Sequence, residues 1–462
     1  MSKHIIYSIT VIMLFMLSCS NSEDNQLITS PELNIKIIDT NPLNSKMEWT
    51  NTSDIHSYNI YLGKELIAEN LVKTFFEFEE LKGLTEYQGE IIAFDTKGQT
   101  VSTKQYTLFT SEKIFEDSIE LKNQKNIDNF ASKGYNIIKG SLIINDETST
   151  ITNLSNFENL QEINGDLLIV NSNLTNLNGL DNVILTSKEA RLLITNNDKL
   201  TNIEALSNIT SLGSLHFINN NLLQNLYGLH KLKTVRQELS ISLNPSINNL
   251  TALQNLSKLH KVNITGNDSL ENLNGLEQIT EVNALVIKNN ISLKAFDGLK
   301  NLSSCELYFT IENNAKLTNL NGLSSLKSIG AIKIINNASL TSISNLSSLI
   351  SVSYLVEVKN NANLISLNGI QNIVYNNSLT GKKLIIQGNP EITTLEAISN
   401  YTFERGVINI SNNSKLDNFC GLKKLLTEIT HKEFDENNFI YNNAYNPSSE
   451  DILNEKCYSA HF

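Results

Sequence analysis

A short apolar pattern recurs along residues 141–426 at a nearly constant spacing, and this repeat constrains the fold more than any other feature. Gly-Leu dipeptides and their Leu or Ile equivalents follow one another at 23 or 24 residues, with steps of 26 and 28 at insertions. A unit of this length cannot bury its apolar face alone, so the units must stack, which predicts a solenoid of about twelve coils. The recurring positions are Leu180, Leu206, Leu229, Leu253, Leu276, Leu299, Leu323, Leu346, Ile370, Ile398 and Leu422.

Each coil combines two periodicities. In one coil Ile332 and Ile334 alternate with other residues, and Leu340, Ile343 and Leu346 then follow at intervals of three. Alternation predicts a strand, whereas spacing by three predicts a tight return path of partly 3₁₀ conformation rather than an α-helix. Strands of successive coils would then form one long parallel sheet, and the fold class is mainly β.

An asparagine stands at the ninth position of most coils. The chain must turn inward there, so its backbone N–H and C=O groups lose water. A short amide can satisfy both kinds of group, because it donates and accepts hydrogen bonds. We therefore expect a structural ladder of stacked amides, formed by Asn197, Asn220, Asn244, Asn267, Asn290, Asn314, Asn337, Asn361, Asn389 and Asn413.

The whole pattern, Leu-x-x-Leu-x-Leu-x-x-Asn in shape, resembles leucine-rich repeats and especially bacterial arrays that are similar to receptor L domains. The resemblance extends from about Ser118 to Leu426 and implies a right-handed solenoid of residues 141–426 with a cap at each end. Residues 112–140 are expected to form a linker and an N-terminal cap with a short helix between Leu121 and Tyr135. Residues 427–462, where the pattern fails, are expected to be the C-terminal cap.

Residues 31–111 have a different pattern, with about seven short alternating strands separated by turns, which is typical of a β-sandwich. Leu84-x-x-Tyr87 resembles the tyrosine corner of fibronectin type III domains, in which a tryptophan, here Trp49, packs in the core. The resemblance implies a spacer or a binding module.

The N-terminus predicts export. Lys3 precedes the apolar run Ile5–Leu17, which has the length of a secretory signal, and Cys19 follows the small residue Ser18. This arrangement resembles the lipobox of bacterial lipoproteins, although Met16 stands where leucine is usual. The resemblance implies a signal peptide of residues 1–18, a lipid on Cys19 and a Bacteroidota-like tether of residues 19–30, with the protein anchored in the outer membrane and exposed on the cell surface. The alternative is a plain signal peptide with an incidental cysteine.

Export to an oxidising compartment bears on the remaining three cysteines. Cys305 falls close to an apolar position of its coil and is expected to be a buried free thiol. That leaves Cys420, in the last regular coil, and Cys457, in the tail, as a disulfide that would pin the C-terminal cap. Tyr441, Tyr445 and Ile452 are the expected apolar anchors of that cap.

Composition and motifs exclude several classes of function. The net charge of -12 disfavours nucleic acid as a partner, because no basic surface is available for phosphates. The chain has no His-Glu-x-x-His, no Gly-x-Ser-x-Gly, no phosphate-binding glycine loop and no zinc-spaced cysteine pair. We expect no enzymatic activity, no cofactor and no metal.

The strand positions that point away from the core form the candidate binding face, because the sheet of a solenoid is its usual docking surface. Protein recognition or adhesion is favoured, since these positions carry few aromatic side chains. The alternative is a glycan-binding lipoprotein of a polysaccharide-uptake system. His260 also falls near a strand and is a weaker candidate contact. The face comprises His216, Lys261, Lys288, Tyr308, Glu312, Lys333, Glu357, Lys359 and Lys383.

Overall fold

The computed structural model describes residues 32–375, 381–402, 406–428 and 439–459, which fall into two compact units. The proposed lipid site, Cys19, and the signal peptide lie outside the described residues. The first unit comprises Lys46–Glu77, Tyr87–Leu108 and the described part of Met1–Ile38, whereas the short segments Asp39–Ser45 and Phe78–Glu86 belong to the second.

Antiparallel strands in two sheets form the sandwich-like N-terminal part. One sheet has the order β1-β2-β5 and the other the order β4-β3-β6-β7. Trp49 and Tyr58 are both buried and pack edge to face, with ring centroids 5.1 Å apart. The strands are β1 (Ile35–Asp39), β2 (Asn44–Trp49), β3 (Ser57–Leu62), β4 (Glu65–Leu71), β5 (Phe75–Glu79), β6 (Glu86–Phe94) and β7 (Thr100–Phe109). The two predicted antiparallel sheets are therefore present, while membership of the fibronectin type III class stays a prediction.

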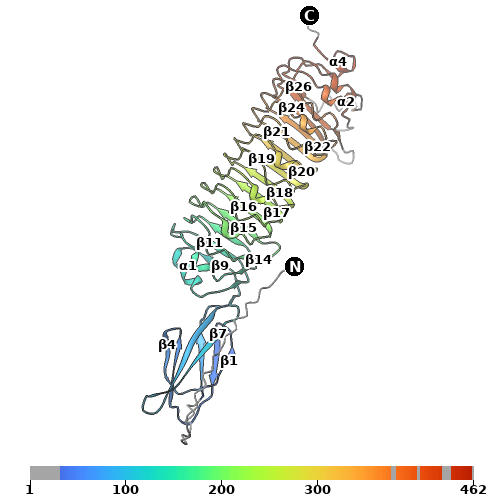
Figure 1. The fold of residues 1–462 in the computed structure, drawn as a ribbon. Coiled ribbons are helices and arrows are strands. Elements are labelled where there is room, and N and C mark those ends of the chain that lie inside the picture. Colours follow the sequence, from blue (N-terminus) through green and yellow to red (C-terminus); the bar gives the residue numbers. More distant parts are fainter. Residues whose placement is uncertain (1–31, 376–380, 403–405, 429–438, 460–462) are drawn as a thin grey trace, which may run out of the picture. The chain divides into compact units, whose positions relative to one another are not determined.

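The second unit is a parallel β-solenoid of about twelve turns, which confirms the predicted stacking of coils. Its main sheet runs from β9 through β26, and Figure 1 shows these strands side by side from coil to coil. In the first coils a short separate sheet, of order β14-β12-β10-β8, precedes it. The strands are β8 (Ile114–Phe115), β9 (Ile119–Leu121), β10 (Ile137–Ile138), β11 (Leu142–Asn145), β12 (Glu162–Ile163), β13 (Leu167–Val170), β14 (Ile184–Leu185), β15 (Arg191–Thr195), β16 (Ser211–Ile218), β17 (Thr234–Ser242), β18 (Lys258–Thr265), β19 (Glu281–Lys288), β20 (Ser304–Glu312), β21 (Ser328–Ile335), β22 (Ser351–Lys359), β23 (Val374–Tyr375), β24 (Lys382–Gln387), β25 (Gly406–Ser411) and β26 (Phe439–Tyr441).

The core lies inside the stack. Ile332 and Ile334 of β21, and Leu340, Ile343 and Leu346 of the return path, are all fully buried. Each such side chain contributes roughly 1.5–3 kcal/mol by leaving water. The period-three segments are turns and 3₁₀ helices, as the spacing predicts. The helical elements are η1 (Ser155–Phe157), η2 (Glu204–Leu206), η3 (Thr251–Leu253), η4 (Asp297–Leu299), η5 (Ser344–Leu346), η6 (Glu396–Ile398), η7 (Cys420–Leu422), α1 (Gln124–Ala131), α2 (Lys423–Glu428) and α4 (Ser449–Leu453).

Two kinds of return path alternate along the stack, so the structural repeat is a pair of coils. One kind contains a 3₁₀ helix. The other contains a glycine with positive φ, and a Cβ on Gly275, for example, would overlap the carbonyl oxygen of Leu250 in the coil before it. The coils with the glycine therefore pack their backbone directly against a coil with a 3₁₀ helix. These glycines are Gly179, Gly228, Gly275, Gly322 and Gly369, and they alternate with η1 to η6.

A helix closes the first coil, as the missing asparagine in this segment predicts. The side chain of Asn123 caps α1 by accepting a hydrogen bond from the backbone N–H of Asn126 at 2.9 Å. The buried Ile127 and Phe130 then lie against the end of the core.

The C-terminal cap is fixed by a disulfide between Cys420 and Cys457, whose Cα atoms are 4.9 Å apart. Ile452 of α4 is fully buried, and Tyr445 is partly buried against the core. Tyr441, however, is 42% exposed, so its expected role as an apolar anchor is wrong. Tyr441 pairs with Ser411 at an outward position of β26, where alternation along the strand turns it away from the core.

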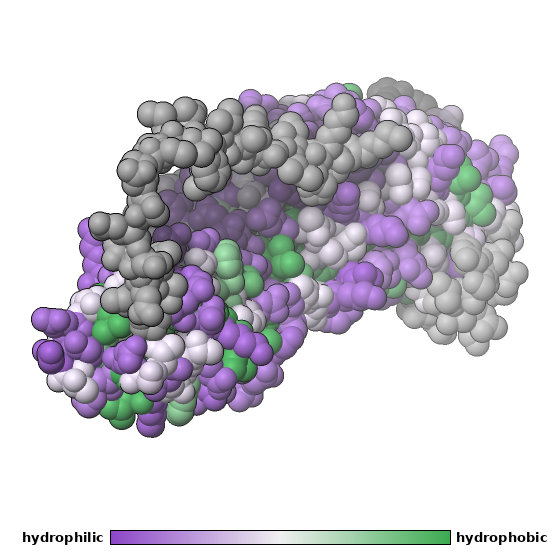
Figure 2. Space-filling model, turned by 60° about the horizontal axis from the view of Figure 1, so that its bottom comes forward, coloured by the Kyte–Doolittle hydropathy of each residue, from purple (hydrophilic) through white to green (hydrophobic). Residues whose placement is uncertain are grey.

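The face of the molecule shown in Figure 2 is mostly polar. Figure 2 shows a face on which hydrophilic residues predominate and hydrophobic residues are scattered among them. Among the described residues, no helix is long and apolar enough to cross a membrane.

Candidate functional site

The nine predicted face residues lie on one side of the main sheet, in three rows that run across the strands. Leu192 and Ile194 of β15 each belong to a buried row, and the positions that alternate with them point to the opposite side. The first outward row is Arg191, Ser214, Glu238, Lys261, Ala284, Tyr308, Ala331, Leu355, Lys383 and Val407. The second is Leu193, His216, Ser240, Asn263, Val286, Thr310, Lys333, Glu357, Ile385 and Asn409. The third is Thr195, Ile218, Ser242, Thr265, Lys288, Glu312, Ile335, Lys359, Gln387 and Ser411.

Several charges on this face are paired between neighbouring coils. Lys261 lies 3.0 Å from Glu238 in the first row, and Lys288 lies 2.6 Å from Glu312 in the third. Such partly exposed pairs contribute at most about 1 kcal/mol each. Within the described residues, four predicted face residues towards the C-terminal end make no ion pair, and their charges are available to a ligand. They are Lys333, Glu357, Lys359 and Lys383.

His216 is half-buried at the other end of the second row. Burial lowers its pKa, the neighbouring charge of Glu238 raises it, and the charges of Arg191 and Lys261 lower it further. The net effect keeps the imidazole neutral at pH 7. His216 is therefore a hydrogen-bonding group of the face and not a cation there.

Bulges in β20 and β22 place one tyrosine each, Tyr308 and Tyr354, at or beside the first row. The hydroxyl of Tyr354 donates a hydrogen bond to the carbonyl oxygen of Leu307 at 2.8 Å, across the intervening coil. That coil has Gly330 at the crossing point, where a Cβ would overlap the same carbonyl oxygen. Tyr308 is the next residue of β20. Tyr354 was not among the predicted face residues, although the four-residue step from Val352 to Val356, against three residues from Ile329 to Ile332 in the coil before, is the sequence signal of an extra, bulged residue.

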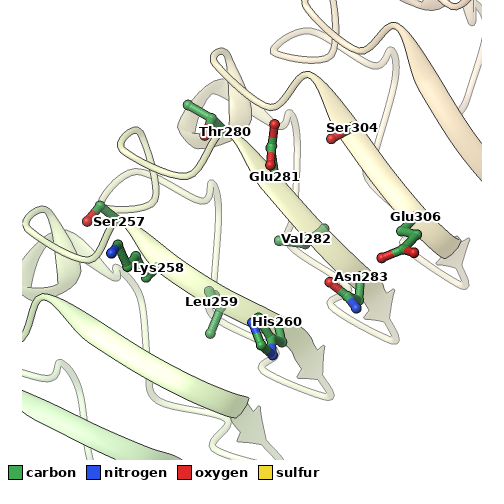
Figure 3. Close-up of a pocket in the computed structure, with 10 residues that line it drawn as sticks. All are labelled: Ser257, Lys258, Leu259, His260, Thr280, Glu281, Val282, Asn283, Ser304 and Glu306. Atoms are coloured by element: carbon green, nitrogen blue, oxygen red, sulfur yellow. The ribbon is translucent and has the colours of Figure 1, made fainter.

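A cavity of about 430 Å³ lies beside the bulge of β20, on β18, β19 and β20. Figure 3 shows His260, Asn283 and Glu306 on three consecutive strands. Each directly follows the first buried residue of its strand. The other side chains that line the cavity are Ser257, Lys258, Leu259, Thr280, Glu281, Val282 and Ser304. His260 is thus a cavity residue, although no sequence pattern grouped it with Asn283 and Glu306.

Cys305 lies on the buried side of β20, next to the cavity residue Glu306. It is a fully buried free thiol, and burial raises its pKa to about 12. Its Sγ donates a hydrogen bond to the carbonyl oxygen of Tyr308 at 3.1 Å. The thiol is therefore a packing group, not a nucleophile.

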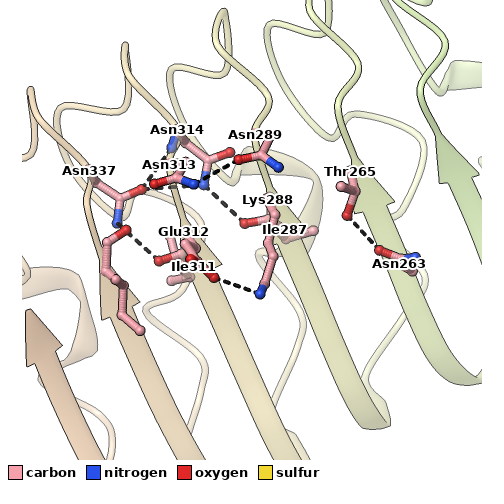
Figure 4. Close-up of polar contacts among 11 residues, drawn as sticks. Asn263, Thr265, Ile287, Lys288, Asn289, Ile311, Glu312, Asn313, Asn314 and Asn337 are labelled. Carbon is pink, nitrogen blue, oxygen red and sulfur yellow. Dashed lines mark hydrogen bonds and ion pairs between the residues drawn. The ribbon is translucent and has the colours of Figure 1, made fainter.

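The predicted asparagines form a continuous buried ladder, of which Figure 4 shows the members Asn314 and Asn337. The Oδ1 of Asn337 accepts from the backbone N–H of Asn314 at 3.1 Å and from its Nδ2 at 3.3 Å. The Nδ2 of Asn337 donates to the carbonyl oxygen of Ile311 at 3.0 Å. Each amide thus accepts from the preceding coil and also satisfies a backbone carbonyl there.

The ladder is longer than the ten predicted asparagines. Asn443 continues it after Asn413, and Asn446 ends it by accepting from the backbone N–H of Asn443 at 2.9 Å. At the other end Ser172 takes the position, and its hydroxyl donates to the Oδ1 of Asn197 at 2.6 Å. These residues break the spacing or the residue type, which is why the repeat pattern did not include them.

A second, exposed row of asparagines accompanies the buried one. Asn313 has a φ of 56°, and its Nδ2 donates to the Oδ1 of Asn289 at 2.9 Å. Asparagine adopts this left-handed conformation more readily than other residues with a Cβ. The sequence signal was the Asn-Asn doublet that occurs in most coils.

Of the comparisons with known proteins, one bears on function. Residues 136–227 match the Receptor L domain family, which suggests that this part of the chain binds a ligand. Curated protein sequences give no match. Among solved structures, the chain is similar to a Yersinia enterocolitica family 28 exopolygalacturonase at 11% identity, with a TM-score of 0.16, over 83% of this chain and 88% of that one. A TM-score this low supports no conclusion. In the part of the chain that the structure describes, no group of three or more His, Cys, Asp or Glu side chains could hold a metal.

Proposed function

We propose that the chain is a lipid-anchored recognition protein of a bacterial outer membrane, which holds an extracellular protein ligand on the three outward rows of the solenoid. The observation that carries this proposal is the unpaired charge of Lys333, Glu357, Lys359 and Lys383 on a continuous sheet face. Charges that a protein does not use internally are available for complementary charges on a partner.

The size of the face supports a protein ligand. The three rows run across ten strands, from β15 to β25, and span five residues of each strand. At about 3.3 Å per residue and 4.8 Å between strands, they present roughly 800 Å². This area is close to the ~800 Å² that each partner buries in a standard protein interface.

A leucine-rich-repeat type of solenoid and a fibronectin type III spacer belong to the same proposal. The Leu-x-x-Leu-x-Leu-x-x-Asn pattern and the Receptor L domain match support the first, and the two antiparallel sheets support the second. We also propose that the chain has no catalytic activity, because its sequence contains none of the catalytic motifs sought above.

Charge reversal on the face tests the recognition role. The full-length wild type and the double variant Lys333→Glu/Lys359→Glu are expressed on cells and cross-linked to surface proteins or matrix proteins, and captured proteins are identified. We expect a ligand that the wild type captures and the variant loses. Lys300→Glu/Lys327→Glu, which reverses two exposed charges outside the three rows, is the control. A ligand that all three forms capture equally would contradict the proposal.

The anchor is tested separately. Labelled fatty acid should enter the wild type and should not enter Cys19→Ala, because the acylated thiol is then absent. Incorporation into the variant would contradict lipidation at this residue without affecting the recognition proposal.

A further inference from the structure

We propose that the cavity on β18, β19 and β20 is a second binding site, which takes a neutral saccharide. It lies beside the first row and does not include the unpaired residues on which the protein ligand is proposed to depend. The inference is therefore independent of that function. Its volume of about 430 Å³ falls in the range of small-ligand sites.

The polar side chains of the cavity have no internal partner. Within the described residues, the side chains of His260, Asn283 and Glu306 make neither a hydrogen bond nor an ion pair. The adjacent Lys261, one residue from His260, is by contrast paired with Glu238. The cavity thus presents amide, imidazole and carboxylate groups side by side, and it offers both donors and acceptors. A polyhydroxylated ligand uses such a mixture, because each sugar hydroxyl donates and accepts.

Charge in the cavity selects against acidic sugars. Glu281 and Glu306 contribute two negative charges, and Lys258 contributes one positive charge. The chain as a whole has a net charge of -12. Electrostatic repulsion would therefore weaken the binding of uronic acids, sialic acids and sulfated sugars. Neutral hexoses and acetamido sugars carry no such penalty.

A peptide fits the site less well. β18, β19 and β20 each have a hydrogen-bonded neighbour on both sides, so none offers a free edge for an added strand. Of the residues that line the cavity, only Leu259 and Val282 are apolar, and both are buried. An apolar anchor side chain would therefore find no pocket here.

The test uses the full-length protein on an array of neutral oligosaccharides, built from hexoses, deoxyhexoses and N-acetylhexosamines, together with uronic-acid, sialylated and sulfated ones. We expect retention of neutral glycans and no preference for acidic ones. Calorimetry with the best neutral glycan should then show binding at least tenfold weaker for Asn283→Ala and for Glu306→Ala. Both side chains lie at the surface, so the melting temperature should be unchanged.

Glu357→Ala, on the second row, is the matched control and should bind the glycan like the wild type. The proposal is overturned if no neutral glycan is retained, if only acidic glycans are retained, or if the two cavity variants bind as the wild type does. If Glu306→Ala instead reduces capture of the protein ligand and no glycan binds, the cavity belongs to the protein interface.

Discussion

Removing one amide from the middle of the ladder should destabilise the solenoid locally and measurably. In Asn337→Ala, the buried backbone N–H of Asn314 loses the Oδ1 that accepts its hydrogen bond, and the carbonyl oxygen of Ile311 loses the Nδ2 that donates to it. An unpaired buried donor costs about 1–3 kcal/mol, and a lost hydrogen bond costs about 1 kcal/mol more. We therefore expect the free energy of unfolding to fall by roughly 2–4 kcal/mol.

Hydrogen exchange at the backbone N–H of Asn314 is the most specific assay, because a stack of coils need not unfold in one step. Exchange at this amide should accelerate more than exchange at amides several coils away. Asn336→Gly is the control, since Asn336 is exposed, has a φ of 56° and makes no ladder hydrogen bond; glycine adopts that conformation without strain. Unchanged protection of Asn314 in Asn337→Ala, together with an unchanged denaturation midpoint, would refute the reasoning.

Three further predictions concern cysteine and glycine residues. Replacing Cys420 and Cys457 by serine should cost roughly 4 kcal/mol by loop entropy over a separation of 37 residues, measured by denaturant unfolding; peptide mapping that finds either thiol free in the wild type would contradict the bond. Gly275→Ala should lower the melting temperature strongly, because its Cβ overlaps the carbonyl oxygen of Leu250, and a wild-type melting curve would show that the coils are not so closely packed. Cys305, with a pKa of about 12, should stay unmodified by iodoacetamide at pH 8 in the folded protein and react once it is unfolded; rapid native labelling would disprove its burial.

The stacking of coils could be predicted because it depends on a pattern that repeats. Ile332 and Ile334 have equivalents in coil after coil. Once the repeat length is known, these positions predict both the strand and its buried face. The position of Asn337 follows from the same period. The disulfide between Cys420 and Cys457 could be predicted from the small number of cysteines, since few pairings were available.

Other features could not be predicted, because similar local sequences have different conformations. Gly275 and Gly298 both precede leucine, yet the first has positive φ and the second lies in η4. Both glycines lie against a carbonyl oxygen of the preceding coil, so neither the dipeptide nor this contact distinguishes their conformations. The contribution of Tyr354 likewise depends on a bulge and on the glycine opposite, and the grouping of Asn283 with Glu306 depends on the register of two strands.

The alternation of two return paths has a consequence for how such an array can change length. A coil with a positive-φ glycine fits against the backbone of a coil with a 3₁₀ helix, as Gly275 does against Leu250. Duplication or loss of two coils preserves every such contact. A change of one coil would instead place two return paths of the same kind next to each other. Evolution and protein engineering should therefore lengthen or shorten this chain in steps of two coils. Among the described coils, only the last two depart from this alternation: both contain a 3₁₀ helix, η6 and η7, and the cap begins after them.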